Sequence, residues 1–328
     1  MKNILIVLCL VSGCASTSSA TPQTAAAPEP PLTAAPVRAR AVAPYYYLGW
    51  GDPPNVQEVM KATGVRWFTL AFVIDAGSCE PSWDAERPLD GARDVALVEA
   101  IRAEGGDVMV SFGGEKGPAL ELSCARADAL AAAYQKVITT YKLKAIDIDI
   151  EGPAYADELA KQRTVAALQQ VRAHNPDVAI FITLASSKTG PNTKLIEQAA
   201  RAGLMVDGWS IMTFDWDDTS NQQAQLTLQA LDHLKAALMT AYGYDEREAY
   251  RHAGISSMNG RSDEGAFVSV ADMRVIAAFA KQRELARLTF WSVNRDRPCP
   301  DATTVVDRCS SIAQQNWDFT RAVADYLK

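Results

Sequence analysis

Residues 145–152 read AIDIDIEG, so acidic residues and isoleucines alternate strictly through this stretch. Side chains two residues apart share one face of a β-strand, so the stretch predicts a strand with Asp147, Asp149 and Glu151 on one face and the isoleucines on the other. Three carboxylates on one face repel one another and are costly to bury. Because stability alone would not select this pattern, we expect the rest of the chain to hold these groups for chemistry.

Outward from this strand, hydrophobic runs and turn signals predict eight strands, each followed by a helix. The strands are expected at 45–50, 67–74, 107–112, 144–151, 178–184, 208–214, 253–257 and 288–292, and the helices at 55–63, 90–104, 126–141, 157–174, 193–202, 222–240, 270–283 and 317–326. This alternation implies an α/β fold with a parallel sheet, and eight repeats favour a single (β/α)8 TIM barrel over residues 45–328. A doubly wound open sheet is the alternative. When such a sheet binds a dinucleotide it carries a glycine-rich phosphate loop after its first strand, which residues 50–54 (WGDPP) do not form.

In such a barrel, catalytic groups cluster at the carboxyl ends of the strands. Glu151 is the last residue of the fourth strand, whereas Asp147 and Asp149 lie deeper on the same inward face. A like-charged neighbour such as Asp149 raises the pKa of Glu151, which suits a general acid. The alternative role for the three carboxylates is a Ca²⁺ or Mg²⁺ site with hard oxygen donors.

Composition excludes some function classes. The chain has 328 residues, enough for one large α/β domain or two small ones. Its 39 Asp and Glu residues outnumber 32 Lys and Arg residues, for a formal charge of −7, and no basic run occurs. Phosphate binding needs clustered Lys and Arg, so this argues against a nucleic-acid partner. The histidines, at 174, 233 and 252, lack HxxxH spacing, which leaves little support for a His-based zinc site.

Four motifs in chain order resemble those of glycoside hydrolase family 18, the chitinases. Residues 145–152 resemble the family's DxxDxDxE signature, and Ser111-Phe112-Gly113-Gly114 resembles its SxGG motif on the third strand. Met212-Thr213-Phe214-Asp215 resembles its MxYD motif on the sixth strand, and Trp291 stands where the family has its eighth-strand tryptophan. The resemblance runs from about residue 45 to the C-terminus and points to the compact bacterial branch, which has no α+β insertion before the eighth strand.

The resemblance implies a retaining hydrolase of β-1,4-linked N-acetylglucosamine polymers, chitin or chito-oligosaccharides, that needs no cofactor or metal. Glu151 would protonate the glycosidic oxygen while the substrate's own acetamido oxygen attacks the anomeric carbon. Asp149 would orient the acetamido group, and Asp147 would support Asp149 by sharing a proton with it. Two other functions remain open: an endo-β-N-acetylglucosaminidase acting on glycoprotein or cell-wall glycans, and a non-hydrolytic glycan-binding protein.

The resemblance also implies a set of substrate-binding residues around the acid. Asp215 would bond the sugar at the cleavage site, and Trp291 would form an apolar floor under it. The full expected set is Trp50, Phe72, Ser111, Gly113, Gly114, Met212, Asp215, Trp216 and Trp291.

The sequence departs from the family pattern at two positions. Lys144 stands at the first Asp of the long signature, deepest in the strand, where we expect a structural effect. Phe214 stands where the family has a Tyr whose hydroxyl helps to hold the acetamido oxygen. Trp216 and Tyr47 are candidates to replace that hydroxyl.

The first residues predict an export signal. The apolar run at 4–10 is too short to span a bilayer as a mature helix. Residues 11–14 (VSGC) resemble the lipobox of bacterial lipoproteins, which implies a signal peptide over 1–13 and a lipid on Cys14. The alternative is an ordinary signal peptide cut near Ala20, and hence a secreted protein.

Residues 14–44 are expected to form a disordered tether between the lipid anchor and the barrel. They are rich in Ala, Pro, Ser and Thr and lack hydrophobic periodicity. Ala15 follows the cysteine where Asp would favour inner-membrane retention, so we expect anchoring to the outer membrane, in the periplasm or at the cell surface. We expect a monomer whose partners are the membrane and an N-acetylglucosamine-containing glycan.

Four cysteines remain in the expected exported domain. An even number in an exported protein indicates two disulfides, with three possible pairings. Cys79 follows the second predicted strand and Cys124 the third, so their loops would be neighbours on the catalytic face. Cys299 and Cys309 lie close together after the eighth strand. We therefore predict Cys79–Cys124 and Cys299–Cys309, each clamping a loop at the rim of the active site.

Overall fold

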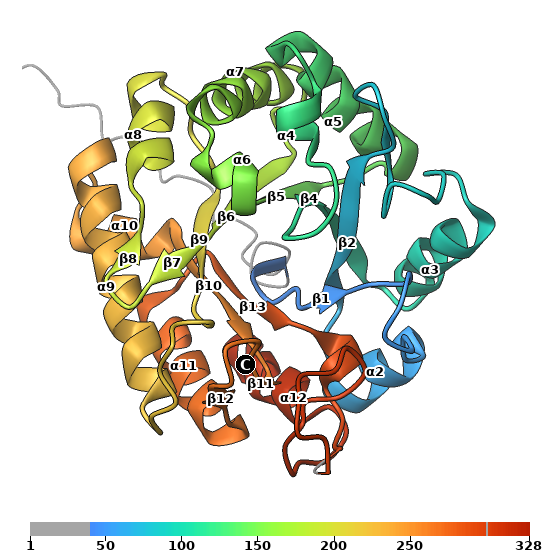
Figure 1. Ribbon diagram of the computed structural model, residues 1–328, viewed down its shortest axis with the longest axis vertical. Coiled ribbons are helices and arrows are strands. Elements are labelled where there is room, and N and C mark those ends of the chain that lie inside the picture. The colour runs from blue at the N-terminus through green and yellow to red at the C-terminus, as the bar shows by residue number, and fades with distance from the viewer. Residues whose placement is uncertain (1–39, 300) are drawn as a thin grey trace, which may run out of the picture. The chain divides into compact units, whose positions relative to one another are not determined.

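The structure is a computed structural model that describes residues 40–299 and 301–328 (Figure 1). The predicted signal peptide, Cys14 and residues 15–39 of the predicted tether lie outside the described residues. Within the described ranges, no helix is long and apolar enough to cross a membrane.

Eight parallel strands of the described chain form a nearly closed barrel, which helices surround (Figure 1). The strands are β1 Tyr45–Tyr46, β2 Trp67–Asp75, β4 Asp107–Gly113, β5 Ala145–Ile150, β6 Ala179–Leu184, β9 Gly208–Met212, β10 Ala253–Met258 and β13 Arg287–Trp291. They are hydrogen-bonded in that order, each parallel to its neighbour. The predicted (β/α)8 barrel is confirmed.

The seam between β1 and β13 is bridged by residues that the sequence assigned to the tether. Val42 pairs in parallel with Leu288 of β13. The carbonyl oxygen of the buried Ala43 accepts hydrogen bonds from Thr69 Oγ1 at 2.6 Å and Thr289 Oγ1 at 2.8 Å. The folded domain therefore begins a few residues before its expected start. The first strand is shorter than predicted, because β1 ends at Tyr46 rather than residue 50.

Eight helices of the described chain follow the strands in turn. They are α2 Val56–Thr63, α3 Ala92–Ala103, α5 Ala127–Tyr141, α7 Glu158–His174, α8 Lys194–Arg201, α9 Gln223–Tyr242, α11 Val270–Arg283 and α12 Asp318–Ala324. Asn55 accepts hydrogen bonds from two first-turn N–H groups of α2, and Ser269 with Asp272 forms a capping box that starts α11. Gly64 and Gly243 end α2 and α9 in left-handed backbone, at φ of 82° and 72°.

The elements that the sequence did not predict are short. They are α4 Leu120–Ser123, α6 Gly152–Ala156, α10 Glu246–Arg251, the turns η1 Val293–Arg295 and η2 Asp325–Leu327, β3 Pro81–Trp83 beside β2, and the hairpins of β7 Ser186–Ser187 with β8 Gly190–Pro191 and of β11 Gly260–Arg261 with β12 Phe267–Val268. None is long enough to leave a clear periodic pattern.

The two faces of the acidic strand β5 differ as its alternating sequence predicts, with the isoleucines on the apolar face. Ile146, Ile148 and Ile150 are buried in the large apolar cluster that β5 shares with helical residues such as Leu168 of α7. A second, smaller apolar cluster consists of Ala43, Trp67, Met109, Ala145, Ala179 and Phe181, which lie at the start of their strands or just before. The amino end of the barrel is thus filled by apolar side chains, and the carboxyl end is free to carry polar groups.

Both predicted disulfides are confirmed. Cys79 pairs with Cys124 at a Cα–Cα distance of 4.7 Å, and Cys299 pairs with Cys309 at 5.9 Å. Both distances lie within the usual range for a disulfide. The bonds tie together the loops after β2 and β4 and close the loop after β13.

Candidate active site

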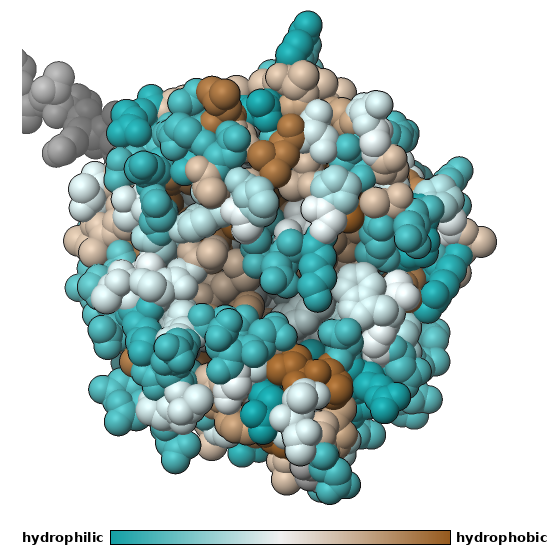
Figure 2. Space-filling view, viewed as in Figure 1, coloured by the Kyte–Doolittle hydropathy of each residue, from teal (hydrophilic) through white to brown (hydrophobic). Residues whose placement is uncertain are grey.

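A cavity of about 450 Å³ opens at the carboxyl end of the barrel. Figure 2 looks onto this face, where hydrophilic residues predominate around the centre. The cavity is lined by Tyr45, Trp50, Phe72, Ile74, Asp84, Glu115, Lys116, Gly117, Asp149, Glu151, Met212, Phe214, Asp215, Ser256, Met258, Asp263, Trp291, Val305 and Asp307. Among the described residues, no group of three His, Cys, Asp or Glu side chains has the arrangement of a metal site.

Asp147, the deepest acidic residue, does not line the cavity. It is fully buried, and its Oδ1 accepts hydrogen bonds from Thr183 Oγ1 at 2.8 Å and from Arg287 Nη1. Its Oδ2 accepts from Ser111 Oγ at 2.7 Å and from the Tyr45 hydroxyl at 2.8 Å. Arg287 is equally buried, so the two form an ion pair inside the barrel. Asp147 is therefore a carboxylate with a counter-charge and a full set of donors.

Asp149 lines the cavity, and one of its carboxylate oxygens has no hydrogen-bond partner. Its Oδ2 lies 3.3 Å from the Tyr45 hydroxyl, whereas its Oδ1 has no hydrogen-bond partner. Only 5% of the residue is exposed. Burial, followed by the charges of Glu151 and Asp147, raises its pKa well above the usual value, although Arg287 and the Tyr45 hydrogen bond oppose the shift. The unpartnered oxygen is a buried acceptor that a ligand's N–H group could satisfy.

Glu151 directly follows β5 at the mouth of the cavity and is half-buried. Burial raises its pKa to about 7, and the carboxylates of Glu115, Asp215 and Asp263 add to the shift. The sequence predicted a raised pKa with Asp149 as the cause. In the structure burial is the largest cause, followed by three loop carboxylates, and Asp149 is not among the causes. With this pKa, the carboxyl group is protonated in a large fraction of the molecules near neutral pH.

The Gly-Gly pair predicted to bind substrate lies behind Asp149 rather than in the cavity lining. Gly113 has φ +94°, and a Cβ there would lie 2.2 Å from the carbonyl oxygen of Asp149. The Gly114 N–H donates to that same oxygen at 2.9 Å, and a Cβ on Gly114 would lie 2.9 Å from the Phe72 ring. These glycines allow the loop after β4 to pack directly against β5.

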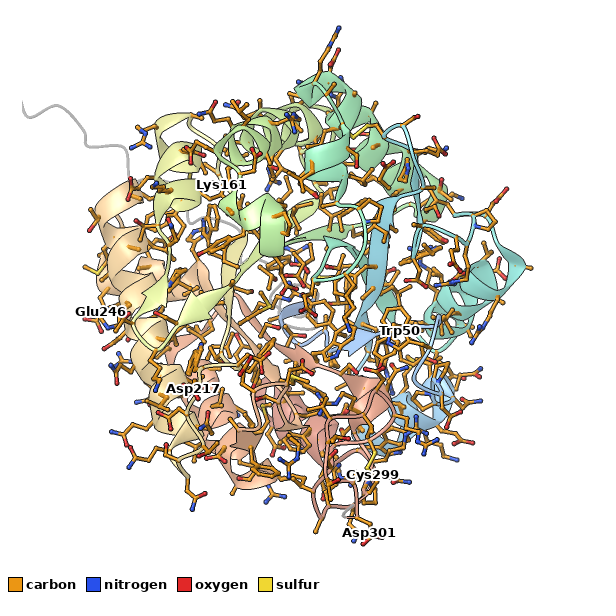
Figure 3. All side chains as sticks on the ribbon, in the orientation of Figure 1. Trp50, Lys161, Asp217, Glu246, Cys299 and Asp301 are labelled. Carbon is orange, nitrogen blue, oxygen red and sulfur yellow. A yellow bond between two sulfur atoms is a disulfide. The ribbon has the colours of Figure 1, made fainter. Side chains whose placement is uncertain are left out.

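Aromatic rings form one wall of the cavity. Trp291, at the end of β13, is half-buried and lines it, as predicted for an apolar floor. Tyr47 stacks on Trp291 at a centroid distance of 4.7 Å, and Phe72 stacks on it at 5.5 Å. Trp50, labelled in Figure 3, stacks on Tyr47 at 4.5 Å and is 38% exposed. The set offers a flat apolar surface of the kind that sugar rings contact.

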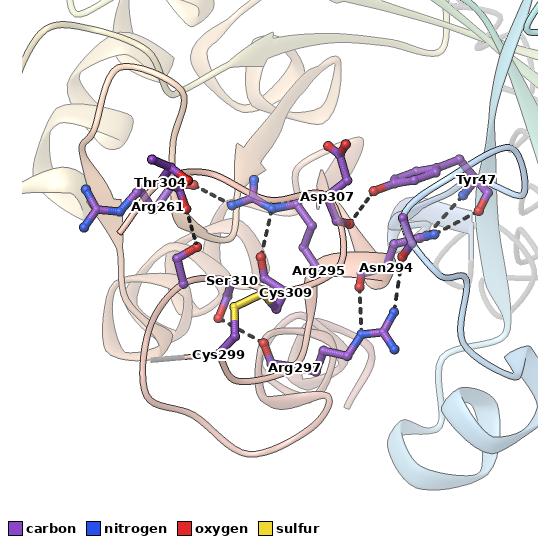
Figure 4. Close-up of a disulfide and its surroundings, with 12 residues drawn as sticks. Tyr47, Arg261, Asn294, Arg295, Arg297, Cys299, Thr304, Asp307, Cys309 and Ser310 are labelled. Carbon is purple, nitrogen blue, oxygen red and sulfur yellow. Dashed lines mark hydrogen bonds between the residues drawn. A yellow bond between two sulfur atoms is a disulfide. The ribbon is translucent and has the colours of Figure 1, made fainter. Parts of the chain in front are cut away.

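The loop closed by the Cys299–Cys309 disulfide forms another wall (Figure 4). Val305 and Asp307 of this loop line the cavity. The Tyr47 hydroxyl donates to the carbonyl oxygen of Asp307 at 2.6 Å. The loop is thus fastened to the aromatic wall, and the Tyr47 hydroxyl is engaged there rather than turned toward the substrate as a replacement for the family tyrosine.

The motif after β9 divides between the cavity and the core. Met212, Phe214 and Asp215 line the cavity, and Asp215 adopts a left-handed φ of 55° with its Oδ1 accepting the Glu264 N–H at 3.1 Å. Trp216 does not line the cavity. Its Nε1 donates to the carbonyl oxygen of Ser186 at 2.8 Å, and its ring is buried. Its indole N–H is therefore already engaged.

Several residues of the site were missed in the sequence. Tyr45 and Arg287 contact Asp147 from strands more than 100 positions away, and Glu115, Asp263 and Asp307 bring charge to the rim from loops. A signal existed for Arg287 alone, because an arginine opening an otherwise apolar strand (RLTFW) needs a buried partner.

The other departure from the family pattern lies far from the chemistry. The Lys144 ammonium is exposed at the amino end of β5 and forms an ion pair with Asp107 Oδ2 at 3.0 Å. This agrees with the structural effect expected there.

Curated relatives and solved structures resemble this chain along most of its length. It is 29% identical over 276 residues to the "Probable bifunctional chitinase/lysozyme" of Escherichia coli (strain K12), covering 78% of this chain and 31% of that protein. It is 27% identical over 277 residues to "Endochitinase 11" of Metarhizium anisopliae, covering 78% of this chain and 52% of that protein. The chain thus spans about a third and about half of these relatives. No protein-family model matches the chain.

The catalytic domain of the hyperthermophilic chitinase from Pyrococcus furiosus is structurally similar, with a TM-score of 0.80 and 29% identity over 87% of this chain and 94% of that chain. A family GH18 chitinase from Chromobacterium violaceum has a TM-score of 0.61 at 16% identity, over 88% of this chain and 83% of that chain, which shows the shared fold. The chain is therefore similar in sequence to proteins named chitinases, and it shares its (β/α)8 barrel with a family GH18 chitinase.

Proposed function

We propose that this protein hydrolyses β-1,4-linked N-acetylglucosamine polymers with retention, using the substrate's acetamido group as the nucleophile and Glu151 as the general acid and base. One observation carries the proposal. A buried, unpartnered carboxylate oxygen, Asp149 Oδ1, lines the same cavity as Glu151, a carboxyl group with a pKa of about 7. The first can accept an acetamido N–H, and the second can donate a proton.

The chemistry proceeds in two steps. Asp149 accepts the acetamido N–H, which turns the acetamido oxygen toward the anomeric carbon. That oxygen forms a bond to the anomeric carbon as the bond to the leaving oxygen breaks, and Glu151 gives its proton to the leaving oxygen. The oxazolinium ion then carries a positive charge that the Asp149 carboxylate stabilises. Ionised Glu151 takes a proton from a water molecule as the water oxygen bonds to the anomeric carbon. The bond from that carbon to the acetamido oxygen breaks, which opens the oxazolinium ring, and Glu151 is again in its acid form.

The rest of the cavity would hold the sugar. Trp291 supplies an apolar surface beneath the ring, and Met212 adds an apolar contact on the wall. Asp215, whose backbone is held in a left-handed turn, can accept a hydrogen bond from the substrate. Ser111, Gly113, Gly114 and Trp216 would act indirectly, by holding Asp147, Asp149 and the cavity wall in position.

Two alternative functions have specific support. The relative from Escherichia coli is named a chitinase/lysozyme, which keeps cell-wall glycan open as a substrate and with it an endo-β-N-acetylglucosaminidase. Phe214 lines the cavity in place of the family tyrosine, which keeps a non-hydrolytic glycan-binding protein open. The lipid on Cys14, the signal peptide and an outer-membrane location, or secretion if Cys14 is not lipidated, are further proposals that rest on the sequence alone.

The test is hydrolysis of chito-oligosaccharides by residues 15–328, with products identified by mass spectrometry. We expect wild-type cleavage, and for Glu151→Gln a loss of about 10²- to 10⁴-fold in rate with binding retained in calorimetry. Glu86→Gln, a matched change at an exposed glutamate outside the cavity, should behave as wild type. Binding without cleavage by the wild-type protein would favour the glycan-binding alternative. Cleavage confined to peptidoglycan or N-glycans would favour the endo-β-N-acetylglucosaminidase.

A further inference from the structure

The cavity is lined by more carboxylates than Asp149 and Glu151, the two that act on the acetamido group and the leaving oxygen. Besides Asp149 and Glu151, five carboxylates line it, and one of these, Asp84, is paired with Arg87 at 2.8 Å. The remaining four come from four different loops: Glu115 after β4, Asp215 after β9, Asp263 between β11 and β12, and Asp307 after β13. We call these four the cleft carboxylates. None of them has a salt-bridge partner among the described residues, whereas Asp84 and Asp147 do.

Two cations offset part of the negative charge of the cleft carboxylates. Lys116 lines the cavity and is exposed, and Arg295 is fully buried behind the wall. Both act on Asp263 and favour its ionised form. Burial and the neighbouring Asp215 carboxylate outweigh them, because the pKa of Asp263 is still raised. The same imbalance acts on Glu151, whose pKa is raised by Glu115, Asp215 and Asp263 together. The cleft therefore presents a net negative potential to whatever enters it.

A fully acetylated chain of N-acetylglucosamine is neutral and would leave this potential uncompensated. A glucosamine residue, in which the acetyl group is missing, carries an ammonium group at the same carbon. That ammonium would gain favourable interaction energy with each nearby carboxylate, and the gain is larger in a concave, partly desolvated site than on an open surface. Neutralising the cleft charge would also remove part of the repulsion among the carboxylates themselves.

At the cleaved bond, the unpartnered oxygen of Asp149 requires an acetylated sugar instead of a glucosamine. This acceptor is buried, and an acetamido N–H can satisfy it while its carbonyl oxygen attacks. A substrate without any acetyl groups would have no nucleophile there. One part of the cavity thus selects an acetylated sugar, and the cleft carboxylates around it favour amino sugars.

We propose that the substrate of this site is partially N-deacetylated chitin, cleaved after an N-acetylglucosamine unit with glucosamine ammonium groups seated against the cleft carboxylates in the neighbouring positions. This inference rests on the proposed hydrolase function and narrows its substrate class. The contacts would be long-range and partly solvent-exposed, so they depend on ionic strength.

The experiment compares kcat/KM for partially acetylated chitosan and for fully acetylated chito-oligosaccharides at about pH 5, where the amines are protonated. The readout is the ratio of the two values as salt is raised. We expect the ratio to favour the partially deacetylated substrate at low salt and to fall with ionic strength, since the acetylated substrate is uncharged. Asp263→Asn and Asp307→Asn should each lower the low-salt ratio by about two- to fivefold.

The ratio separates substrate charge from general effects on the enzyme. A change in the protonation of Glu151 or in the folded fraction alters kcat/KM for both substrates alike, so it cancels in the ratio. Asp177→Asn makes the same charge change at an exposed residue between α7 and β6, at the opposite end of the barrel, and should leave the ratio unchanged. Cleavage of both substrates with a salt-independent ratio would overturn the inference and leave the hydrolase intact. Cleavage of neither would overturn the proposed function itself.

Discussion

The two ends of strand β5 carry the same residue type in the same alternation, yet they form different environments. At the deep end, Asp147 is fully buried, accepts four hydrogen bonds and is paired with Arg287. At the mouth, Asp149 and Glu151 form no salt bridge with a described residue, and both have raised pKa values. The hydroxyl of Tyr45 lies between the two environments, 2.8 Å from Asp147 Oδ2 and 3.3 Å from Asp149 Oδ2.

The contrast shows how one pattern can serve both stability and chemistry. A buried carboxylate with an arginine and three hydroxyl donors is a structural anion. A buried carboxylate beside a second one, without a salt bridge, has a raised pKa and can exchange protons or bind a ligand. The prediction that Asp147 shares a proton with Asp149 stays a prediction. The arginine gives Asp147 another source of compensation.

The largest change to the deep end is expected for Arg287→Met. It leaves the Asp147 carboxylate buried without its counter-charge, which should reduce the free energy of unfolding by about 3–5 kcal/mol. Urea denaturation followed by circular dichroism measures the effect. Arg287→Lys, which keeps the positive charge and loses the planar fork, should cost less.

A double variant sharpens this test. Asp147→Asn combined with Arg287→Met removes both charges and should recover part of the stability that Arg287→Met loses. Unchanged stability in Arg287→Met would contradict the assignment of Asp147 as a paired structural anion.

The next largest effect is expected at the mouth, as a pH dependence. The pKa of Glu151 is raised from 4.5 to about 7, so the folded state binds its proton more tightly than the unfolded state. The resulting contribution to stability is complete below pH 4.5 and is lost as the pH rises through 7. Glu151→Gln does not ionise there, so it should gain stability relative to wild type across this window, by at most about 3 kcal/mol.

Thermal unfolding of the two proteins at several pH values measures this difference. Glu86→Gln, on the exposed surface, provides the control, since it should show no such gain. A constant difference in stability between Glu151→Gln and wild type from pH 4 to pH 8 would mean that the pKa of Glu151 is not raised in the folded protein.

The smallest effect is expected for Phe214→Tyr. Phe214 lines the cavity, and a hydroxyl on this ring would restore the hydrogen bond that the family tyrosine makes to the acetamido oxygen. One such bond is worth about 1 kcal/mol, so kcat/KM should rise by about fivefold. An unchanged or reduced value would indicate that Phe214 acts only through packing.

Much of the barrel could be predicted from the sequence because its signals are local. Each long strand is an apolar run, and caps such as Asn55 and Ser269 mark helix starts within one residue of the observed ones. The alternation in residues 145–152 settled which face of β5 is apolar. The same reasoning failed for β1, because the aromatic residues after Tyr46 pack against Trp291 rather than continuing the sheet.

The site was less predictable, since its chemistry depends on contacts between distant positions. The acid strand and the lining residues Met212, Asp215 and Trp291 could be named from motifs. The pairing of Asp147 with Arg287 joins residues 140 positions apart, and no local pattern encodes that distance. Loop carboxylates such as Asp263 lie on a short hairpin that the sequence did not indicate, so the charge of the cleft could be seen only in three dimensions.

The central claim, that Glu151 and an Asp149-oriented acetamido group hydrolyse the glycan together, is tested most directly by the anomeric form of the first product. Proton NMR can follow hydrolysis of a chito-oligosaccharide before mutarotation equilibrates the new reducing end. Attack by the acetamido oxygen followed by water inverts the anomeric carbon twice, so we predict that the β-anomer appears first. Initial formation of the α-anomer would mean direct attack by water and would contradict the account.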